Sequence, residues 1–372
     1  LLIKGGRLLD PASDRDDVAD VALAGGRIAA VTEDIPESDA REVFDATGCI
    51  VTPGLIDMHT HVYVGASLIS VDADEHAPSS GVTTWVDAGT AGAANIEGLR
   101  RFVIERAAVR ILPFLNIAAP GLPTGTRSHE NIRDLDVDLA LQAVEKHRDI
   151  VRGVKVLCSG PQVGANDLAP LRLALELAEA AGLPIMCHIG APPPALGAVL
   201  PLLRSGDMVT HCYKGRAGCL IAAGDRVRKE AWDARERGVL FDVGHGCGSF
   251  SWKVAKICLD QGFAPDTIST DLHAKSVNGP AFSMASVMSK FRHLGMELME
   301  CIRCATHRPA AYLGISDEIG TLKEGACGDV AVLRLEEETR ALPDCEGVEE
   351  TVQRQLRGVL TVRAGRILTA PE

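Results

Sequence analysis

Short apolar runs alternate with longer amphipathic stretches through the middle of the chain. Runs of this length between turn residues are typical of buried parallel strands. The predicted strands are Ile50–Asp57, Val82–Asp87, Arg110–Ile117, Val151–Leu157, Pro184–His188, Met208–His211, Val239–Val243 and Thr267–Asp271. Between them lie predicted helices such as Ala169–Ala181, which follows Asn166 and Asp167 and ends before Gly182, as a capped helix does.

Eight strands joined by helices predict an α/β fold of the (β/α)8 TIM barrel type, which typically takes about 250 residues. A doubly wound open sheet is the alternative, but no Gly-x-Gly-x-x-Gly turn opens the pattern. Residues 1–50 and 316–372 instead read as short strands separated by turns that contain Gly, Pro, Ser and Asp. We therefore expect a small β-sandwich built from residues 1–52 and 316–372, beside a barrel of residues 53–315.

Composition narrows the class of protein. Apolar residues make up 46% of the 372 residues and charged residues 24%, which is ordinary for a globular domain. The net charge of −12 disfavours nucleic acid and anionic membranes as partners, and no apolar run approaches the roughly 20 residues of a membrane span. The first residues lack the basic leader and apolar run of a secretion signal. We expect a cytoplasmic protein, with a homo-oligomer left open.

The eleven cysteines are scattered and odd in number, which predicts reduced thiols. Cys301 and Cys304 have the spacing of a metal or redox motif, but they lie in a helical pattern without a second such pair. We interpret them as buried helix cysteines.

Residues that can bind metals fall where several predicted strands end. The first strand leads into His59 and His61, which point the same way in extended chain because side chains alternate. Further polar residues lie in or at the ends of later strands, namely Lys155, His188, His211 and Asp271. The carboxyl ends of barrel strands meet at one face, where barrel enzymes keep their active sites. The sequence therefore predicts a metal site there.

The segment Pro53-Gly-Leu-Ile-Asp-Met-His-Thr-His61, the lysine of the fourth strand, the two later histidines and the aspartate of the eighth strand resemble the amidohydrolase superfamily. The resemblance implies that CO₂ carboxylates Lys155, giving a carbamate that bridges two divalent metal ions, with Zn²⁺ expected. It places His59, His61 and Asp271 on one ion and His188 and His211 on the other. It also implies a metal-bridging hydroxide as nucleophile, with Asp271 as the catalytic proton shuttle.

Residues near these strand ends are candidates for substrate binding: Tyr63, Tyr213, His245, His273 and Asn278. Dihydroorotases of the superfamily carry an arginine two residues after the second histidine, and this chain has Tyr63 there. The segments 81–93 and 241–246 are similar to a group of deacetylases and dihydroorotase-like proteins.

We therefore expect a deacetylase-like hydrolase that cleaves an amide or ester of a small carboxylate-bearing molecule, such as an N-acyl amino acid or an acetylated hydroxy acid. Three alternatives stay open. They are a cyclic amidohydrolase of the dihydroorotase or hydantoinase type, a mononuclear aminohydrolase resembling adenine deaminase, and a non-catalytic scaffold. The strand-four lysine argues against the second, and the complete ligand set argues against the third.

Overall fold

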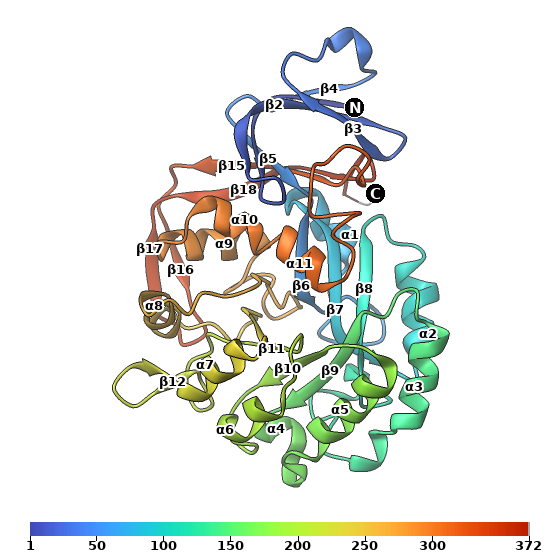
Figure 1. The fold of residues 1–372 in the computed structure, drawn as a ribbon, viewed down its shortest axis with the longest axis vertical. Coiled ribbons are helices and arrows are strands. Elements are labelled where there is room, and N and C mark those ends of the chain that lie inside the picture. The colour runs from blue at the N-terminus through green and yellow to red at the C-terminus, as the bar shows by residue number, and fades with distance from the viewer. Residues whose placement is uncertain (371–372) are drawn as a thin grey trace.

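The computed structural model describes residues 1–370 and contains a TIM-like barrel beside a mixed, mostly antiparallel sheet formed by both ends of the chain (Figure 1). Seven parallel strands form the barrel wall in the order β14-β11-β10-β9-β8-β7-β6. They are β6 (Leu55–Thr60), β7 (Val82–Gly92), β8 (Arg110–Asn116), β9 (Gly153–Cys158), β10 (Ile185–Ile189), β11 (Met208–Thr210) and β14 (Leu240–Asp242). The predicted barrel is confirmed.

The eighth position of the barrel is held by backbone hydrogen bonds to both neighbouring strands and by two buried carboxylates. The segment 267–272 makes one parallel bridge on each side, Asp242 with Thr267 and Thr60 with Leu272. The Asp242 carboxylate accepts hydrogen bonds from the hydroxyls of Thr267 at 2.6 Å and Ser269 at 2.8 Å. On the other side, the Asp57 carboxylate accepts the backbone N–H of Thr270 at 3.0 Å. Two buried carboxylates thus supplement the backbone hydrogen bonds and help to close the barrel.

The terminal sheet brings the two ends of the chain together in the order β19-β18-β15-β5-β1-β2-β3, with β4 beside β1. Its strands are β1 (Leu2–Asp10), β2 (Arg15–Ala24), β3 (Arg27–Thr32), β4 (Val43–Asp45), β5 (Ile50–Pro53), β15 (Val330–Glu336), β18 (Gln355–Arg363) and β19 (Arg366–Ile367). Apolar side chains of both ends form one core there, including Leu8, Val51 and Val332. The domain boundaries themselves stay a prediction.

The predicted strand Ile50–Asp57 is two strands in different sheets. Strand β5 ends at Pro53 in the terminal sheet and β6 begins at Leu55 in the barrel. Between them, a Cβ on Gly54 would lie 2.2 Å from the Thr83 hydroxyl oxygen, so only glycine passes there without a clash. Both strands are apolar and fully buried, which is why hydrophobicity alone does not separate them.

Helices cover the outside of the barrel (Figure 1). The predicted helix is α5, which buries Leu171, Ala174, Leu177 and Ala178 and ends at Gly182 in the left-handed conformation, with φ of 64°. The helices are α1 (Ala73–His76), α2 (Ile96–Leu99), α3 (Val137–Lys146), α4 (Gly160–Val163), α5 (Ala169–Ala181), α6 (Leu196–Val199), α7 (Lys229–Glu236), α8 (Trp252–Asp260), α9 (Met284–His293), α10 (Leu298–Arg303) and α11 (His307–Tyr312). Among residues 1–370, no helix has the length and apolar character to cross a membrane.

Two small hairpins stand apart from the main sheets. One joins β12 (Ile221–Ala222) to β13 (Arg226–Val227). The other joins β16 (Arg340–Pro343) to β17 (Glu349–Val352) and lies beside α8 and α9, not in the terminal sheet (Figure 1). In its turn, the Asp344 carboxylate accepts the N–H of Trp252, and the Cys345 N–H donates to the carbonyl of Phe250. The hairpin β16–β17 thus fastens the chain that follows the seventh barrel strand.

Candidate active site

A small cavity lies where the barrel strands end, with a volume of about 200 Å³. All six predicted metal ligands line it. The complete lining is His59, His61, Ile69, Leu122, Thr126, Lys155, Leu157, Gln162, His188, His211, Cys247, Gly248, Ser249, Asp271 and His273. The size fits a small molecule, and the wall away from the ligands carries aliphatic side chains.

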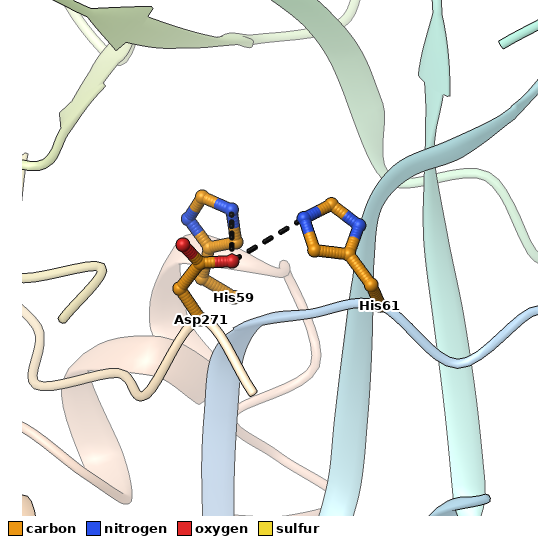
Figure 2. Close-up of side chains that lie close together, drawn as sticks. All are labelled: His59, His61 and Asp271. Atoms are coloured by element: carbon orange, nitrogen blue, oxygen red, sulfur yellow. Dashed lines mark ion pairs between the residues drawn. The ribbon is translucent and has the colours of Figure 1, made fainter. Parts of the chain in front are cut away.

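Figure 2 shows His59, His61 and Asp271 turned toward one another. The Oδ1 atom of Asp271 lies 3.5 Å from His59 Nε2 and 3.3 Å from His61 Nε2. One potential ligand atom from each of the three residues lies within 4.8 Å of the others. They come from opposite ends of the barrel sequence, and the closure of the barrel between β6 and the segment 267–272 places them side by side.

Hydrogen bonds behind the rings determine which imidazole nitrogens face the cavity. His211 Nδ1 lies 2.6 Å from the Gly244 carbonyl, which can only accept, so Nδ1 carries the proton and Nε2 keeps its lone pair. The Thr210 hydroxyl donates to Asp242 at 2.8 Å and so accepts from His59 Nδ1 at 2.8 Å. Such outer hydrogen bonds typically orient metal-binding histidines.

Lys155 and the other histidine pair complete the ring of polar groups. The Nζ of Lys155 lies 3.2 Å from His59 Nε2, and His211 Nε2 lies 2.8 Å from His188 Nδ1. Space for the lysine stem depends on Gly89, because a Cβ there would lie 2.5 Å from both Cβ and Cγ of Lys155. All four side chains are largely shielded from solvent.

Two of the polar residues have strained backbones. His211 and Asp271 adopt positive φ values of 71° and 46°, which side chains other than glycine rarely accept. His211 directly follows β11 and Asp271 lies near the end of the segment 267–272, and at both positions the side chain lines the cavity. Strain of this kind is typically retained at functional sites.

The electrostatics of the site favour neutral imidazoles and an ionised carboxylate. Burial lowers the pKa of His59 and His188 well below the usual value and that of His211 to about 4. Burial alone would raise the pKa of Asp271, but the close approach of His61 and the charges of nearby histidines hold it at about 2. Burial also lowers the pKa of Lys155 to about 8.

These residues fit a divalent metal ion. The Oδ1 atom of Asp271 is buried and has no hydrogen-bond partner among the described residues, a costly state for a carboxylate oxygen unless a cation meets it. Neutral imidazole nitrogens and a carboxylate are the ligands that zinc and similar ions accept.

Of the five predicted substrate contacts, one lines the cavity. His273 lines the cavity, with Nε2 3.9 Å from Asp271 Oδ2. The structure does not bring the other four to it. The hydroxyl of Tyr63 donates to the Asn95 carbonyl at 3.1 Å and that of Tyr213 to the Phe263 carbonyl at 2.8 Å.

The remaining two predicted contacts also lie outside the cavity lining. His245 is fully buried, and its Nε2 accepts a hydrogen bond from Lys290 at 2.9 Å. Asn278 is exposed to solvent.

Several residues that line the cavity were not predicted from the sequence. Ile69, Leu122 and Thr126 lie in the segments that connect the strands and Gln162 lies in the short helix α4, and none of them belongs to a motif. Thr210, which orients His59 from outside the cavity lining, was also not predicted, although its place immediately before His211 is a usable signal.

Comparisons with known proteins agree with this geometry. The family model for the amidohydrolase family matches residues 251–361. A deacetylase of Brucella anthropi is 33% identical over 347 residues, which cover 93% of this chain and 86% of the relative.

The chain belongs to the amidohydrolase family. It is an enzyme of the metal-dependent hydrolases of this superfamily, so the expected class and fold are confirmed. Two solved structures are similar over nearly their whole length: one described as an adenine deaminase, with TM-score 0.92, 32% identity and 98% of both chains covered, and one described as a dihydroorotase, with TM-score 0.90, 31% identity and 99% and 98% covered. Relatives of this amidohydrolase thus carry names from three different reactions.

Proposed function

We propose that this amidohydrolase removes an acyl group from a small carboxylate-bearing molecule, as a deacetylase acting on N-acyl amino acids or acetylated hydroxy acids. The observation that carries the proposal is the buried, unpartnered Oδ1 of Asp271 beside neutral imidazoles in a small cavity. The deacetylase of Brucella anthropi, similar over 93% of the chain, supports acyl removal.

The ligand set would be six residues. His59, His61 and Asp271 would hold one divalent ion, His188 and His211 a second, and a carbamate on Lys155 would bridge them. The ions, when bound, supply Lewis acidity that polarises the acyl carbonyl and acidifies the attacking water. The close approach of Lys155 Nζ to His59 Nε2, at 3.2 Å, supports the bridging position. A carbamate also replaces an ammonium, which cations would repel, with two anionic oxygens.

Asp271 would then move the proton. Its pKa of about 2 keeps the carboxylate ionised at neutral pH, so it can accept a proton from the attacking water. It later gives that proton to the leaving nitrogen or oxygen, which restores the carboxylate. His273 lies 3.9 Å from Oδ2, close enough to steer that oxygen.

The cavity supports a compact acyl substrate. Its volume of about 200 Å³ accommodates an acetyl group and a short side chain, and Ile69, Leu122 and Leu157 offer an apolar wall. The Tyr63 side chain, found where dihydroorotases have an arginine, has its hydroxyl on a backbone carbonyl. Ring opening of dihydroorotate therefore lacks its usual carboxylate anchor at this position.

A substrate panel and one variant test the proposal. Purified enzyme with defined metal content is offered N-acetyl D- and L-amino acids, acetylated hydroxy acids, dihydroorotate, hydantoins and adenine. We expect hydrolysis of the acetylated acids and about two metal ions per chain. Asp271→Asn should lower kcat by about a thousandfold or more with most of the metal retained. Wild-type turnover by this variant, or ammonia release from adenine with one metal per chain, contradicts the proposal.

A further inference from the structure

Lys214 is a half-buried cation without an acidic partner near the mouth of the site. It follows His211 by three residues, and its N–H donates to the His211 carbonyl at 3.2 Å, which curls the chain back over the strand end. Among residues 1–370, no carboxylate lies within ion-pair distance of its Nζ. Nearby Arg216 differs, because Glu346 lies 3.7 Å from its Nε. Lys214 therefore keeps an unneutralised charge in partly shielded surroundings.

The ammonium of Lys214 lies near the end of β10. Its Nζ is 3.6 Å from the position that a Cβ on Gly190 would take. Gly190 directly follows β10 and is two residues after His188. The same Cβ would lie 2.6 Å from the hydroxyl oxygen of Ser159, which donates to the side-chain oxygen of Gln162. Gln162 lines the cavity, so Lys214, Ser159 and Gln162 form a polar rim on the β9–β10 side.

Lys214 lies beside the part of the site that His188 and His211 form. Its Nζ lies near Gly190, and its backbone N–H donates to the carbonyl of His211. An anion at the rim would therefore meet an ammonium that has no carboxylate partner among residues 1–370. Ile69 and Leu122, which also line the cavity, offer aliphatic contacts.

We infer that Lys214 binds the substrate carboxylate at the polar rim and makes the enzyme specific for acyl compounds that carry one. The inference rests on the proposed function. In this arrangement the acyl carbonyl lies among the histidines while the carboxylate pairs with Lys214 Nζ near the end of β10. Gly190 leaves open the space between the two, because any side chain there would meet Ser159 and approach the ammonium.

A matched pair of substrates isolates this contact. N-acetylalanine and N-acetylalaninamide, each as both enantiomers, present the same acetyl amide and differ only in the carboxylate. We expect Lys214→Met to raise KM for N-acetylalanine by about tenfold or more, the cost typical of losing one charged contact, and to leave kcat/KM for the amide nearly unchanged. Lys214→Arg, which keeps the charge, should restore most of the preference.

Lys253→Met is the control, because that lysine is exposed on α8 and pairs with Asp225 away from the cavity. Metal content should equal that of the wild type in all three variants. An unchanged preference for the carboxylate in Lys214→Met overturns the inference. If the wild type hydrolyses neither compound, the proposed function fails. Calorimetric binding of the two compounds then decides separately whether Lys214 recognises the carboxylate: a preference lost in Lys214→Met supports it, and an equal preference overturns it.

Discussion

Two lysines of this enzyme are each buried against a histidine, but they have different roles. Lys155 is 1% exposed and lies 3.2 Å from His59, whereas Lys290 is 0% exposed and lies 2.9 Å from His245. Burial lowers the pKa of both, to about 8 for Lys155 and about 7 for Lys290. Desolvation therefore does not distinguish them.

The difference lies in how many acceptors each ammonium meets. Lys290 donates to His245 Nε2, to the Pro280 carbonyl at 3.0 Å and to the Pro343 carbonyl, one acceptor for each N–H. Phe250 and Trp252 add ring faces about 5 Å away, at 5.1 and 5.3 Å. Lys155 meets only His59 and the sulfur of Met186 at 3.6 Å.

A satisfied buried lysine stabilises the fold, and an unsatisfied one beside a cavity is available for chemistry. Lys290 joins three segments of chain, whereas Lys155 faces the open cavity and the unpartnered oxygen of Asp271. The comparison therefore assigns Lys155 to the site and Lys290 to its scaffold.

Lys155→Ala tests the proposed role of the lysine in the site, and we expect it to have the largest effect of these variants. Without the proposed bridge, we expect metal content to fall and hydrolysis to drop by about a thousandfold or more. Short carboxylic acids added to the buffer should restore part of both, because they supply the missing bridging oxygens. Elemental analysis and initial rates measure this. Unchanged metal content without such acids would remove the bridging role.

Lys290→Met tests the structural role of the other buried lysine. Removal of the ammonium leaves His245 and two buried carbonyls without a donor, and we expect a loss of about 2–4 kcal/mol in the free energy of unfolding. Denaturant unfolding of the metal-free protein measures it. Metal content of the folded variant should equal that of the wild type. Loss of metal with unchanged stability would reverse the assignment of the two lysines.

Thr210→Val tests the hydrogen bond that orients His59, the histidine beside Lys155. The hydroxyl of Thr210 orients His59, whereas His245 Nδ1 is held by the backbone carbonyl of Gly246. We expect about a 10–100-fold loss in metal affinity, the typical cost of removing an outer hydrogen bond to a ligand. Thr83→Val is the control, since its buried hydroxyl lies 3.5 Å from the Leu55 carbonyl, away from the cavity. Equal metal affinities in both variants would contradict the orienting role.

Tyr63→Phe should have the smallest effect and tests a residue outside both pairs. The change removes one hydrogen bond to the Asn95 carbonyl, worth about 0.5–1.5 kcal/mol of stability. Because Tyr63 does not line the cavity, kcat/KM for the best acetylated substrate should match that of the wild type. A large rise in KM would return Tyr63 to the substrate contacts.

The barrel and the cluster of polar strand ends could be predicted because both follow from local patterns. Apolar runs of strand length and the periodicity of α5 are short-range signals, and the convergence of strand ends in a barrel is a general rule. The switch of sheets at Gly54 was not predictable, since β5 and β6 are equally buried. The eighth strand was predicted at Thr267–Asp271, but its hydrogen bonds to Asp57 and Asp242 were not, because these two residues are distant from it in sequence.

Substrate contacts were the weakest part of the prediction for a related reason. Proximity in sequence to a ligand does not determine the direction of a side chain. His245 follows the seventh strand as His273 follows the eighth, yet His245 turns to Lys290 and His273 turns to the cavity. The partner that decides, Lys290 on α9, lies 45 residues away and carries no motif.

The hydrogen bonds made by the hairpin β16–β17 also determine when, during synthesis, the cavity wall can be completed. Residues 247–249 of the cavity wall lie between His245 and Phe250, and both of these are held through Pro343 and Cys345. Synthesis proceeds from the N-terminus, so every proposed metal ligand has emerged from the ribosome well before this fastening exists. The proposed ligands are thus synthesised early, but the wall that shapes the cavity can be completed only after residue 345 has been made.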